Sequence, residues 1–458
     1  MTEQIQKKLS SLDEPQELPH QETLTVWGLA WPSILNNLLF SFVGLVSIYA
    51  VGNIGTEAVA AVGTGQRIFW IFQAIIMAIM AGTTALVARA VGAKNMEEAA
   101  QVTRASIGLC VALAFLAMAI VFFSGESIIN LLGLDEETKR LSLNYLYVLI
   151  VFTPAFSISM VISTSLRAAG DAKTPLLIGL FANVINIFLL LGLVNGKFGL
   201  PLLGTIGAAL SGGIAFSLAS ILGIGLWLGN YLIIRVGQSG SLSKERIQRI
   251  IHVAYPAAME AIVFQLGLLS FFWIVALYGT APVAAYNIGI NLLMVSFTVG
   301  GGFAIAGATL TGQKLGAKNP DGAMKSGYEA AGMTVLSMGI LGVIVAYYSR
   351  ELASFFIDDP DVVNYVVNFV IIFAIIQPFM AIEFSLSGAL RGAGDTRSPL
   401  IITLVGLILV RVPLAYVLYK GGLGVEWVFG TLIADYILKA FLFMIRYRSK
   451  RWMKALSD

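Results

Sequence analysis

Three acidic residues stand inside long apolar stretches of this sequence, where an ionised side chain is costly. Glu260 lies one helical turn after Pro256, Glu383 lies in the phrase MAIEFSLSG, and Asp435 lies in the last apolar stretch. A charge at the centre of a membrane helix costs about 2.5–3.5 kcal/mol on insertion scales, so such residues usually serve a function. A carboxylate in this position can bind a proton or Na⁺ and attract a cationic ligand. Glu260 is our leading candidate, and the one at which Na⁺ would bind.

Each carboxylate also has a purely structural interpretation. Glu260 could pair with a basic residue at the cytoplasmic end of a helix, and Glu383 could be a neutral carboxyl held by hydrogen bonds between helices. Asp435 lies four residues before Lys439, so these two side chains can pair on one helix face. Both interpretations stay open for all three carboxylates.

Basic residues within the apolar stretches could balance these charges. Arg411 precedes Val412 and Pro413, and the proline is expected to kink that helix. Arg67 lies in the second apolar stretch. We expect Lys439, Arg411 and Arg67 to balance the carboxylates, and Arg411 is also a candidate to bind an anionic group.

Neutral polar residues could complete an ion or ligand site through their amide and hydroxyl groups. The alternative is that they form hydrogen bonds between helices, which contribute only about 0.6 kcal/mol on average in a membrane. The candidates are Asn36, Asn37, Ser47, Asn183, Asn186, Gln265 near Glu260, Tyr286, Asn287 and Gln377.

The composition predicts an all-α membrane protein whose main surroundings are the lipid bilayer. Hydrophobic residues make up 57% of the chain and charged residues 12%, whereas soluble domains are about 25% charged. About twelve apolar segments are each long enough for the roughly 20 residues that a bilayer requires. They run over residues 26–50, 59–88, 105–124, 142–165, 175–195, 203–234, 250–278, 283–312, 326–348, 363–387, 399–419 and 426–446.

The placement of charge predicts the orientation in the membrane. Most of the 29 Lys and Arg residues fall in loops on the side of the N-terminus, and such loops face the cytoplasm. We therefore expect an inner-membrane protein, monomeric, with both termini cytoplasmic. Because topology explains the basic residues, the net charge of +3 gives no reason to expect a nucleic-acid partner.

Several kinds of chemistry find no support in the sequence. Cys110 is the only cysteine, and two histidines are too few for a zinc centre. No G-x-x-x-x-G-K-[ST] phosphate loop is present, and no His/Asp/Glu cluster has metal or protease spacing. We expect neither an enzyme nor a cofactor, so the chain should be a carrier driven by an ion gradient.

A repeated phrase divides the chain into two halves. SLRAAGDAKTPL at 165–176 returns as ALRGAGDTRSPL at 389–400, and VGAKN at 91–95 returns as LGAKN at 315–319, both 224 positions later. We interpret the first phrase as a hairpin in which Gly170 ends one helix and Thr174 caps the next. Two parallel repeats of six spans each are typical of alternating-access carriers. The expected division is a tail at 1–24, an N-lobe at 25–236, a linker at 237–248, a C-lobe at 249–448 and a tail at 449–458.

These phrases, with GTEAVAA at 55–61 and PAAMEAIVFQLG at 256–267, resemble the multidrug and toxic compound extrusion (MATE) family. The resemblance implies twelve helices in two six-helix lobes that form a V. It also implies export of organic cations or other amphipathic drugs in exchange for Na⁺ or H⁺. The sequence departs from the family pattern at Ser47 and Leu190, where many members carry Asp, so an N-lobe carboxylate mechanism is not expected.

The resemblance and the carboxylates together suggest an exchange cycle. The outward-open carrier would take up the coupling ion at C-lobe carboxylates led by Glu260, and the inward-open carrier would release it and load substrate. Each ligand would displace the other because both favour one negative site. The alternative is a flippase for lipid-linked or other amphipathic anionic substrates, which would need a cationic cavity. A receptor or scaffold that transports nothing is the other class, and it would predict no gradient-driven flux.

Overall fold

The computed structural model describes residues 24–235 and 243–456, and this part of the chain is helical with connecting turns. Eleven of its helices are long and apolar enough to cross a membrane, and α5 with α6, bent by 50°, forms the twelfth span. The predicted all-α membrane fold is confirmed. The spans are α2 (Val26–Gly52), α3 (Thr56–Gly92), α4 (Met96–Asn130), α5 (Glu136–Val151) with α6 (Thr153–Ala168), α7 (Lys173–Asn195), α8 (Gly204–Leu228), α9 (Lys244–Ala276), α10 (Thr280–Gly316), α11 (Pro320–Tyr347), α13 (Pro360–Gly392), α14 (Arg397–Thr403) with η1 (Leu404–Arg411) and α15 (Val412–Lys420), and α16 (Val425–Arg448).

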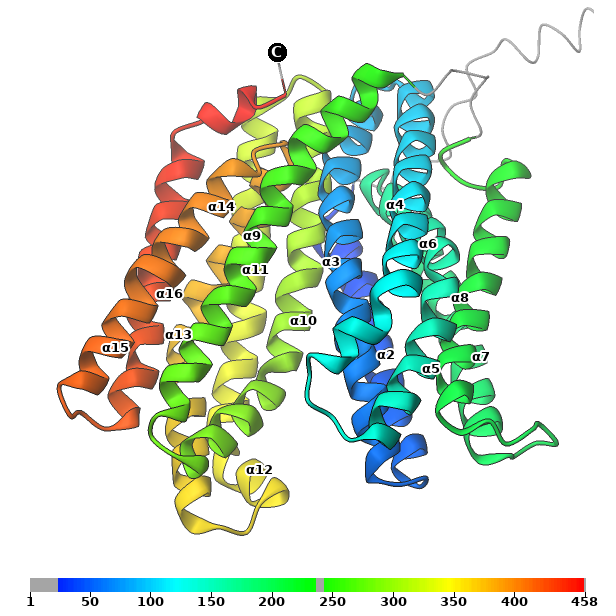
Figure 1. The fold of residues 1–458 in the computed structure, drawn as a ribbon. Helices are drawn as coiled ribbons and strands as arrows, with labels where there is room; N and C mark the ends of the chain where they lie inside the picture. The colour runs from blue at the N-terminus through cyan, green and yellow to red at the C-terminus, as the bar shows by residue number, and fades with distance from the viewer. Residues whose placement is uncertain (1–23, 236–242, 457–458) are drawn as a thin grey trace, which may run out of the picture.

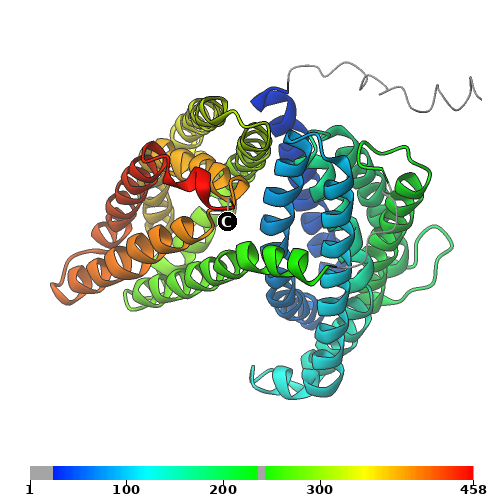
Figure 2. The same ribbon diagram turned by 90° about the horizontal axis from the view of Figure 1, so that it is seen from above.

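The helices gather into two bundles (Figures 1 and 2). We use N-lobe for α2–α8 and C-lobe for α9–α16. Two short helices, α12 (Ser349–Phe356) and η2 (Arg451–Lys454), lie outside the spans. The helix α9 begins at Lys244, so the last residues of the predicted linker already belong to the C-lobe. The predicted N-terminal tail, except Leu24, and linker residues 237–242 lie outside the described residues.

The internal repeat is visible in the helix bounds. Helix α10 covers 280–316, which is α3 at 56–92 shifted by 224 residues. Helix α13 covers 360–392, which is the pair α5–α6 at 136–168 shifted by the same amount. The copies differ in shape, because α13 runs on through Pro378 whereas its counterpart breaks at Phe152. In these two pairs the duplication therefore preserved the element bounds while local geometry diverged.

The repeated LRxAGD phrases form the same turn in each lobe. Gly170 and Gly394 end a helix with φ of +98° and +90°, values that favour glycine. Oδ1 of Asp171 then accepts the backbone N–H of Thr174 at 2.9 Å. Asp395 accepts the N–H of Ser398 at 3.2 Å in the same way. The predicted capping by the Thr174 side chain is therefore wrong: the aspartate supplies the acceptor, because its carboxylate reaches three residues forward.

This turn provides a direct test of the capping assignment. Asp171→Ala should lower the free energy of unfolding by about 1 kcal/mol, because it removes acceptors for two backbone N–H groups. Thr174→Ala should leave stability unchanged within error. Thermal unfolding of both variants in one detergent would check this, and equal losses would contradict the assignment to the aspartate.

The two lobes meet at one face of the molecule, where α3 crosses α10. A Cβ on Gly92 would overlap the backbone carbonyl of Gln313, and a Cβ on Gly316 would overlap that of Arg89. Residues 89 and 313, like 92 and 316, are 224 apart, so the crossing is pseudo-symmetric. Gln313 also donates its side-chain N–H to the carbonyl of Ala168 at 2.8 Å. The repeated GAKN loops thus begin where the lobes are in closest contact.

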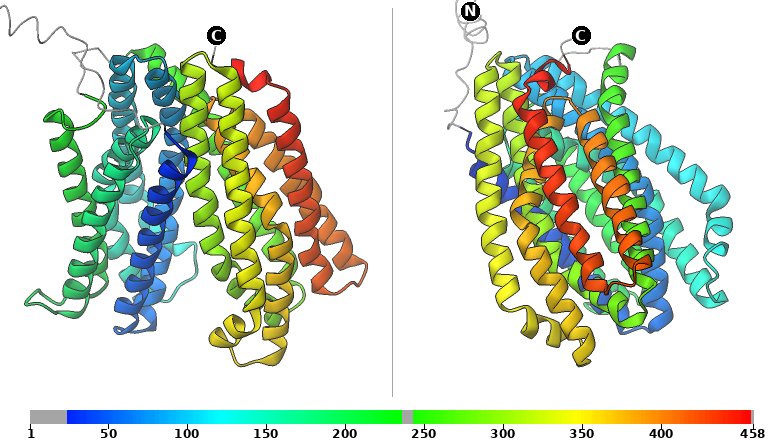
Figure 3. Two further views of the ribbon diagram at one scale, coloured as in Figure 1. Left: turned by 180° about the vertical axis from the view of Figure 1, so that it is seen from behind. Right: turned by 90° about the vertical axis from the view of Figure 1, so that its left-hand side faces the viewer.

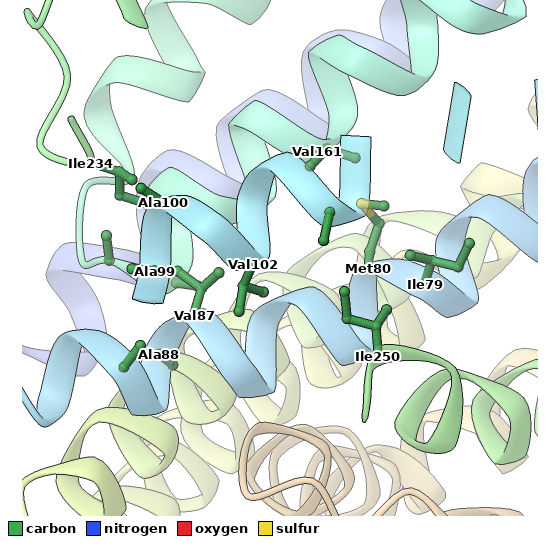
Figure 4. Packing of buried hydrophobic residues seen from close by; sticks show 14 of the residues in the cluster. Ile79, Met80, Val87, Ala88, Ala99, Ala100, Val102, Val161, Ile234 and Ile250 are labelled. Carbon is green, nitrogen blue, oxygen red and sulfur yellow. The ribbon is translucent and has the colours of Figure 1, made fainter. Parts of the chain in front are cut away.

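Apolar packing reinforces the same face. Figure 4 shows Ile250, from the start of α9, against Ile79 and Met80 of α3 in a buried cluster. A second cluster joins Leu29 of α2 to Phe303 of α10. These contacts involve the first halves of α2 and α9 and the second halves of α3 and α10. The first and last described residues lie on this side as well, because Leu24 lies against Gly170 and Leu456 against Gly394.

We call this side the closed face. The bundles separate toward the opposite side (Figure 3), which gives the V shape implied by the family resemblance. The two bundles are therefore in contact on the closed face and spread apart toward the other side.

Candidate functional site

Four segments of the C-lobe bring buried charges together: α9, α13, η1 and α16. Lys439, Asp435 and Arg411 are 1%, 0% and 3% exposed. Nζ of Lys439 lies 2.8 Å from Oε2 of Glu383 and 3.5 Å from Oδ2 of Asp435. Nε of Arg411 lies 3.4 Å from the same Asp435 oxygen. Lys439 thus joins the predicted carboxylates of two helices, and Arg411 balances Asp435.

Aromatic rings pack against both buried cations. Nζ of Lys439 lies 4.0 Å from the ring centre of Tyr436. The Arg411 guanidinium lies 5.0 Å from the ring centre of Phe271 and 5.5 Å from that of Tyr436. Such contacts stabilise a cation by about 0.5–2 kcal/mol, most where it is desolvated. The rings therefore help to keep both charges inside the bundle.

Glu260 forms the second part of the network. Its Oε1 accepts a hydrogen bond from Arg391 at 2.7 Å, and Thr403 lies 3.4 Å away. Its Oε2 is buried and has no hydrogen-bond partner among the described residues. The open structural alternative, pairing with a basic residue at a helix end, is therefore what the structure shows. Oε2 remains an available acceptor for a proton.

Arg391 is a site residue that the sequence analysis missed. It belongs to the repeated phrase ALRGAGD, which we interpreted only as a helix end. With Arg391 included, three basic side chains face three carboxylates, so the network is balanced in charge. The carboxylates that we expected to form a negative site are therefore each paired with a basic side chain.

The helix carrying Arg411 is distorted, but not as predicted. A π-helix, η1, precedes Pro413, and the N–H of Val412 bonds to the carbonyl of Leu407, five residues earlier. Proline does not simply kink the helix. A Cβ at Gly406, inside η1, would overlap Oδ1 of Asp435. The wide turn and the missing side chain let α16 bring its charges close to this helix.

None of the remaining C-lobe candidates hydrogen-bonds to the charged groups of this network in the described part of the chain. Gln265 is exposed. It follows Glu260 by five residues, which places its side chain roughly 140° around the helix axis from that of Glu260. Asn287 is exposed too, and Tyr286 packs against aromatic rings. Gln377 is buried and donates to Ser296 at 2.8 Å.

Arg67 is exposed on the N-lobe and forms no ion pair with a described residue, so it balances none of the three carboxylates.

The N-lobe holds a cavity of about 410 Å³ instead of a charge network. Of the predicted N-lobe candidates, Ser47 and Asn186 line it, whereas Asn36, Asn37 and Asn183 do not. Leu190 lines it as well, so both positions that depart from the family pattern face this space. No charged side chain of the described residues lines the cavity.

Seven aromatic rings make up much of the cavity wall, and sequence reasoning did not single them out as a group. They come from five segments of the N-lobe, which hides their proximity in the sequence. Gln73 also lines the cavity, and its buried amide has no hydrogen-bond partner among the described residues. The wall can therefore stack on a flat apolar molecule and offer it a hydrogen bond. The rings are those of Phe40, Phe69, Trp70, Tyr145, Phe152, Phe156 and Phe216.

Comparison with known proteins agrees with this architecture. The MatE family model matches residues 32–191 and 256–417, one segment in each lobe. The chain belongs to the MatE family. It is 31% identical over 444 residues to the probable multidrug resistance protein NorM of Thermotoga maritima, covering 93% of this chain and 92% of that protein. It is 25% identical to the uncharacterized transporter YisQ of Bacillus subtilis, covering 95% and 96%.

Solved structures share the fold of this MatE-family chain. A MOP superfamily transporter from Pyrococcus furiosus aligns with a TM-score of 0.86 at 19% identity, covering 94% of this chain and 96% of that one. A crystal structure of MATE in the straight conformation aligns with the same TM-score at 18% identity and the same coverage. The chain is therefore a multi-pass membrane transporter of the MATE fold.

Proposed function

We propose that this transporter exports amphipathic drugs, organic cations among them, by proton-coupled antiport across the cytoplasmic membrane. The observation that carries the proposal is the C-lobe network, in which two buried carboxylates and one partly buried carboxylate each lie against a basic side chain. The name of the Thermotoga maritima relative, a probable multidrug resistance protein, supports the substrate class.

The balance of charge favours a proton over Na⁺ as the coupling ion. A Na⁺ ion at Glu260 would share its carboxylate with the Arg391 guanidinium, which already lies 2.7 Å away. Two cations so close repel each other strongly in a site with little water. A proton instead removes the negative charge and leaves the partner cation unpaired. Proton binding would therefore loosen an ion pair between two helices.

The same balance changes the expected mechanism of exchange. A neutral network does not attract a cationic drug, so direct competition at Glu260 is replaced by coupling between sites. Protonation of a carboxylate would weaken contacts of α9 or α16 with α13 and shift the lobe toward its other conformation. The proton, bound in the C-lobe, and the drug, bound in the N-lobe, would thus shift the same equilibrium between the two conformations of the transporter.

The N-lobe cavity is the proposed drug site. Its aromatic wall can stack on flat molecules and hold an organic cation through the ring faces. The Gln73 amide can bond to a polar group of the same molecule. Because no charged side chain of the described residues lines the cavity, neutral amphipathic molecules should bind as well as cationic ones.

The flippase alternative receives little support. It requires a cationic cavity, yet the N-lobe cavity has no basic side chain of the described residues in its lining. The basic residues Arg411 and Lys439 are buried and paired with carboxylates. With the closed face toward the cytoplasm, as the basic loops predict, the structure corresponds to the outward-open stage of export.

Transport by the purified chain in proteoliposomes tests the proposal. We expect a pH gradient to drive flux of a fluorescent organic cation and a Na⁺ gradient of equal size to drive little. Glu260→Gln should reduce pH-driven flux at least about tenfold, because loss of a coupling carboxylate removes the driving step. Glu351→Gln, which removes a carboxylate from an exposed position of the same lobe in the short helix α12, is the matched control and should transport normally.

A second variant separates the drug site from the coupling site. Trp70→Ala should raise the substrate concentration for half-maximal flux, whereas Glu260→Gln should lower the maximal flux. Wild-type flux in Glu260→Gln would exclude that carboxylate, and equal flux under a Na⁺ gradient alone would exclude proton coupling.

A further inference from the structure

A second cavity, of about 400 Å³, lies at the closed face of the C-lobe, away from both proposed transport sites. It is formed by the turn between α13 and α14, the first turns of α9, the end of α16 and the short helix η2. Four Lys and Arg side chains, His252 and one acidic side chain line it. The charged residues are Arg397, Arg446, Arg451, Lys454 and Asp395, and we call this cavity the basic pocket.

The one carboxylate of the basic pocket is already engaged. Oδ2 of Asp395 accepts two hydrogen bonds from Arg446, at 2.7 and 2.9 Å. Its Oδ1 accepts the N–H of Ser398, as described above. Arg397 and Arg451 are exposed and form no ion pair with any described residue. Gathering like charges in one cavity is unfavourable unless an anion balances them.

The position of the η2 cations is fixed by packing. Trp452, in the same short helix, is fully buried and stacks on Tyr447 with ring centres 4.7 Å apart. Its indole N–H donates to the carbonyl of Tyr447 at 2.7 Å. The helix that carries Arg451 and Lys454 is therefore anchored to α16. Preorganised cations bind an anion with less loss of conformational entropy than mobile ones.

The surroundings of the basic pocket fit a phosphate group at the depth of the lipid headgroups. The pocket lies where α14 begins and α16 ends, at the edge of the apolar spans. Ile401 lines it and is 57% exposed, which offers an apolar surface beside the cations. Guanidinium groups match the oxygen pairs of phosphate, and basic pockets between cytoplasmic helix ends bind anionic lipid headgroups.

We propose that the basic pocket binds a phosphate-bearing anion, supplied by the headgroup of an anionic membrane lipid or by free phosphate. Such an anion would also hold the closed face together. Arg89 of the N-lobe donates to the carbonyl of Met453, in η2, at 3.3 Å. Binding beside η2 would stabilise the segment that reaches the other lobe.

Thermal unfolding of the purified chain in a neutral detergent tests this binding without measuring transport. The probes are dioctanoyl-phosphatidylglycerol, dioctanoyl-phosphatidylcholine and inorganic phosphate, each titrated at constant ionic strength. We expect a saturable rise in Tm with phosphatidylglycerol and none with phosphatidylcholine. A saturable rise with inorganic phosphate alone would support the pocket and assign free phosphate as its ligand.

Variants of the basic pocket test whether the rise in Tm comes from binding there. Arg397→Gln with Arg451→Gln should weaken the apparent affinity at least about tenfold, because it removes two of the cations that attract an anionic headgroup. The control, Lys173→Gln with Arg448→Gln, removes the same charge from exposed positions at the same face and should bind like wild type. Native mass spectrometry of bound phosphatidylglycerol gives a second readout if a variant unfolds early. Equal loss in both double variants, an equal rise with phosphatidylcholine, or no saturable rise with any probe would overturn the proposal.

Discussion

Lys439→Met is expected to abolish transport and to lower the free energy of unfolding by about 3–5 kcal/mol. Lys439 lies against both Glu383 and Asp435 and is 1% exposed, so its removal leaves Glu383 without a basic partner and Asp435 with Arg411 alone. Breaking a buried ion pair on one side costs more than the pair itself contributes, because the remaining charge stays desolvated. Thermal unfolding and flux in proteoliposomes would measure both losses.

The charge-balance interpretation also predicts a partial rescue. Lys439→Met with Glu383→Gln removes one charge of each sign and leaves Arg411 with Asp435 and Arg391 with Glu260. Most of the lost stability should return, whereas transport should stay low because a coupling carboxylate is missing. Unchanged stability in Lys439→Met, or no recovery in the double variant, would contradict this account of the network.

Gly92→Ala is expected to disfavour the closed face and to shift the carrier toward its other conformation. The new methyl group would overlap the backbone carbonyl of Gln313, which cannot rotate away as a flexible side chain can. Overpacking of this kind typically costs about 1–3 kcal/mol, and about 1.4 kcal/mol already changes a two-state ratio about tenfold. Only the conformation in which α3 contacts α10 incurs this cost.

Distance measurements between spin labels would detect the shift. Glu97→Cys and Asp321→Cys, combined with Cys110→Ser, place one label on each lobe at the closed face. Gly92→Ala should add a longer distance to the distribution. Gly63→Ala, in the same helix, is the matched control because a Cβ added there meets no atom within 4 Å. Identical distributions in the two glycine variants would contradict the prediction.

Much of the fold could be predicted from the sequence because membrane helices are recognisable from local composition. Apolar length indicated the twelve spans, and the 224-residue offset indicated two related halves whose helix bounds match at α3 and α10. Local detail was harder to predict. The acceptor at the start of α7 is Asp171, not Thr174, and η1 replaces a simple proline kink. Both depend on small backbone differences that residue types do not specify.

The candidate site, too, could be predicted from the sequence only in part. Sequence alone identified Glu260, Glu383 and Asp435, because a carboxylate in an apolar span is conspicuous wherever it points. It did not identify Arg391 as the partner of Glu260, since the two are 131 residues apart on different helices. The aromatic cavity was missed for the same reason: its seven rings come from five segments of the N-lobe.

The sequence by itself therefore determined the membrane fold, the duplication and the residues able to carry charge, because hydropathy and identity are properties of each position. The tertiary structure alone decided which charges meet, which face is closed and which lobe keeps an uncharged cavity. Equivalent helices show the difference, since Asn36 occupies the place in α2 that Glu260 occupies in α9. Pairing and closure arise from distances between helices, and those distances are set by the packing of the whole bundle.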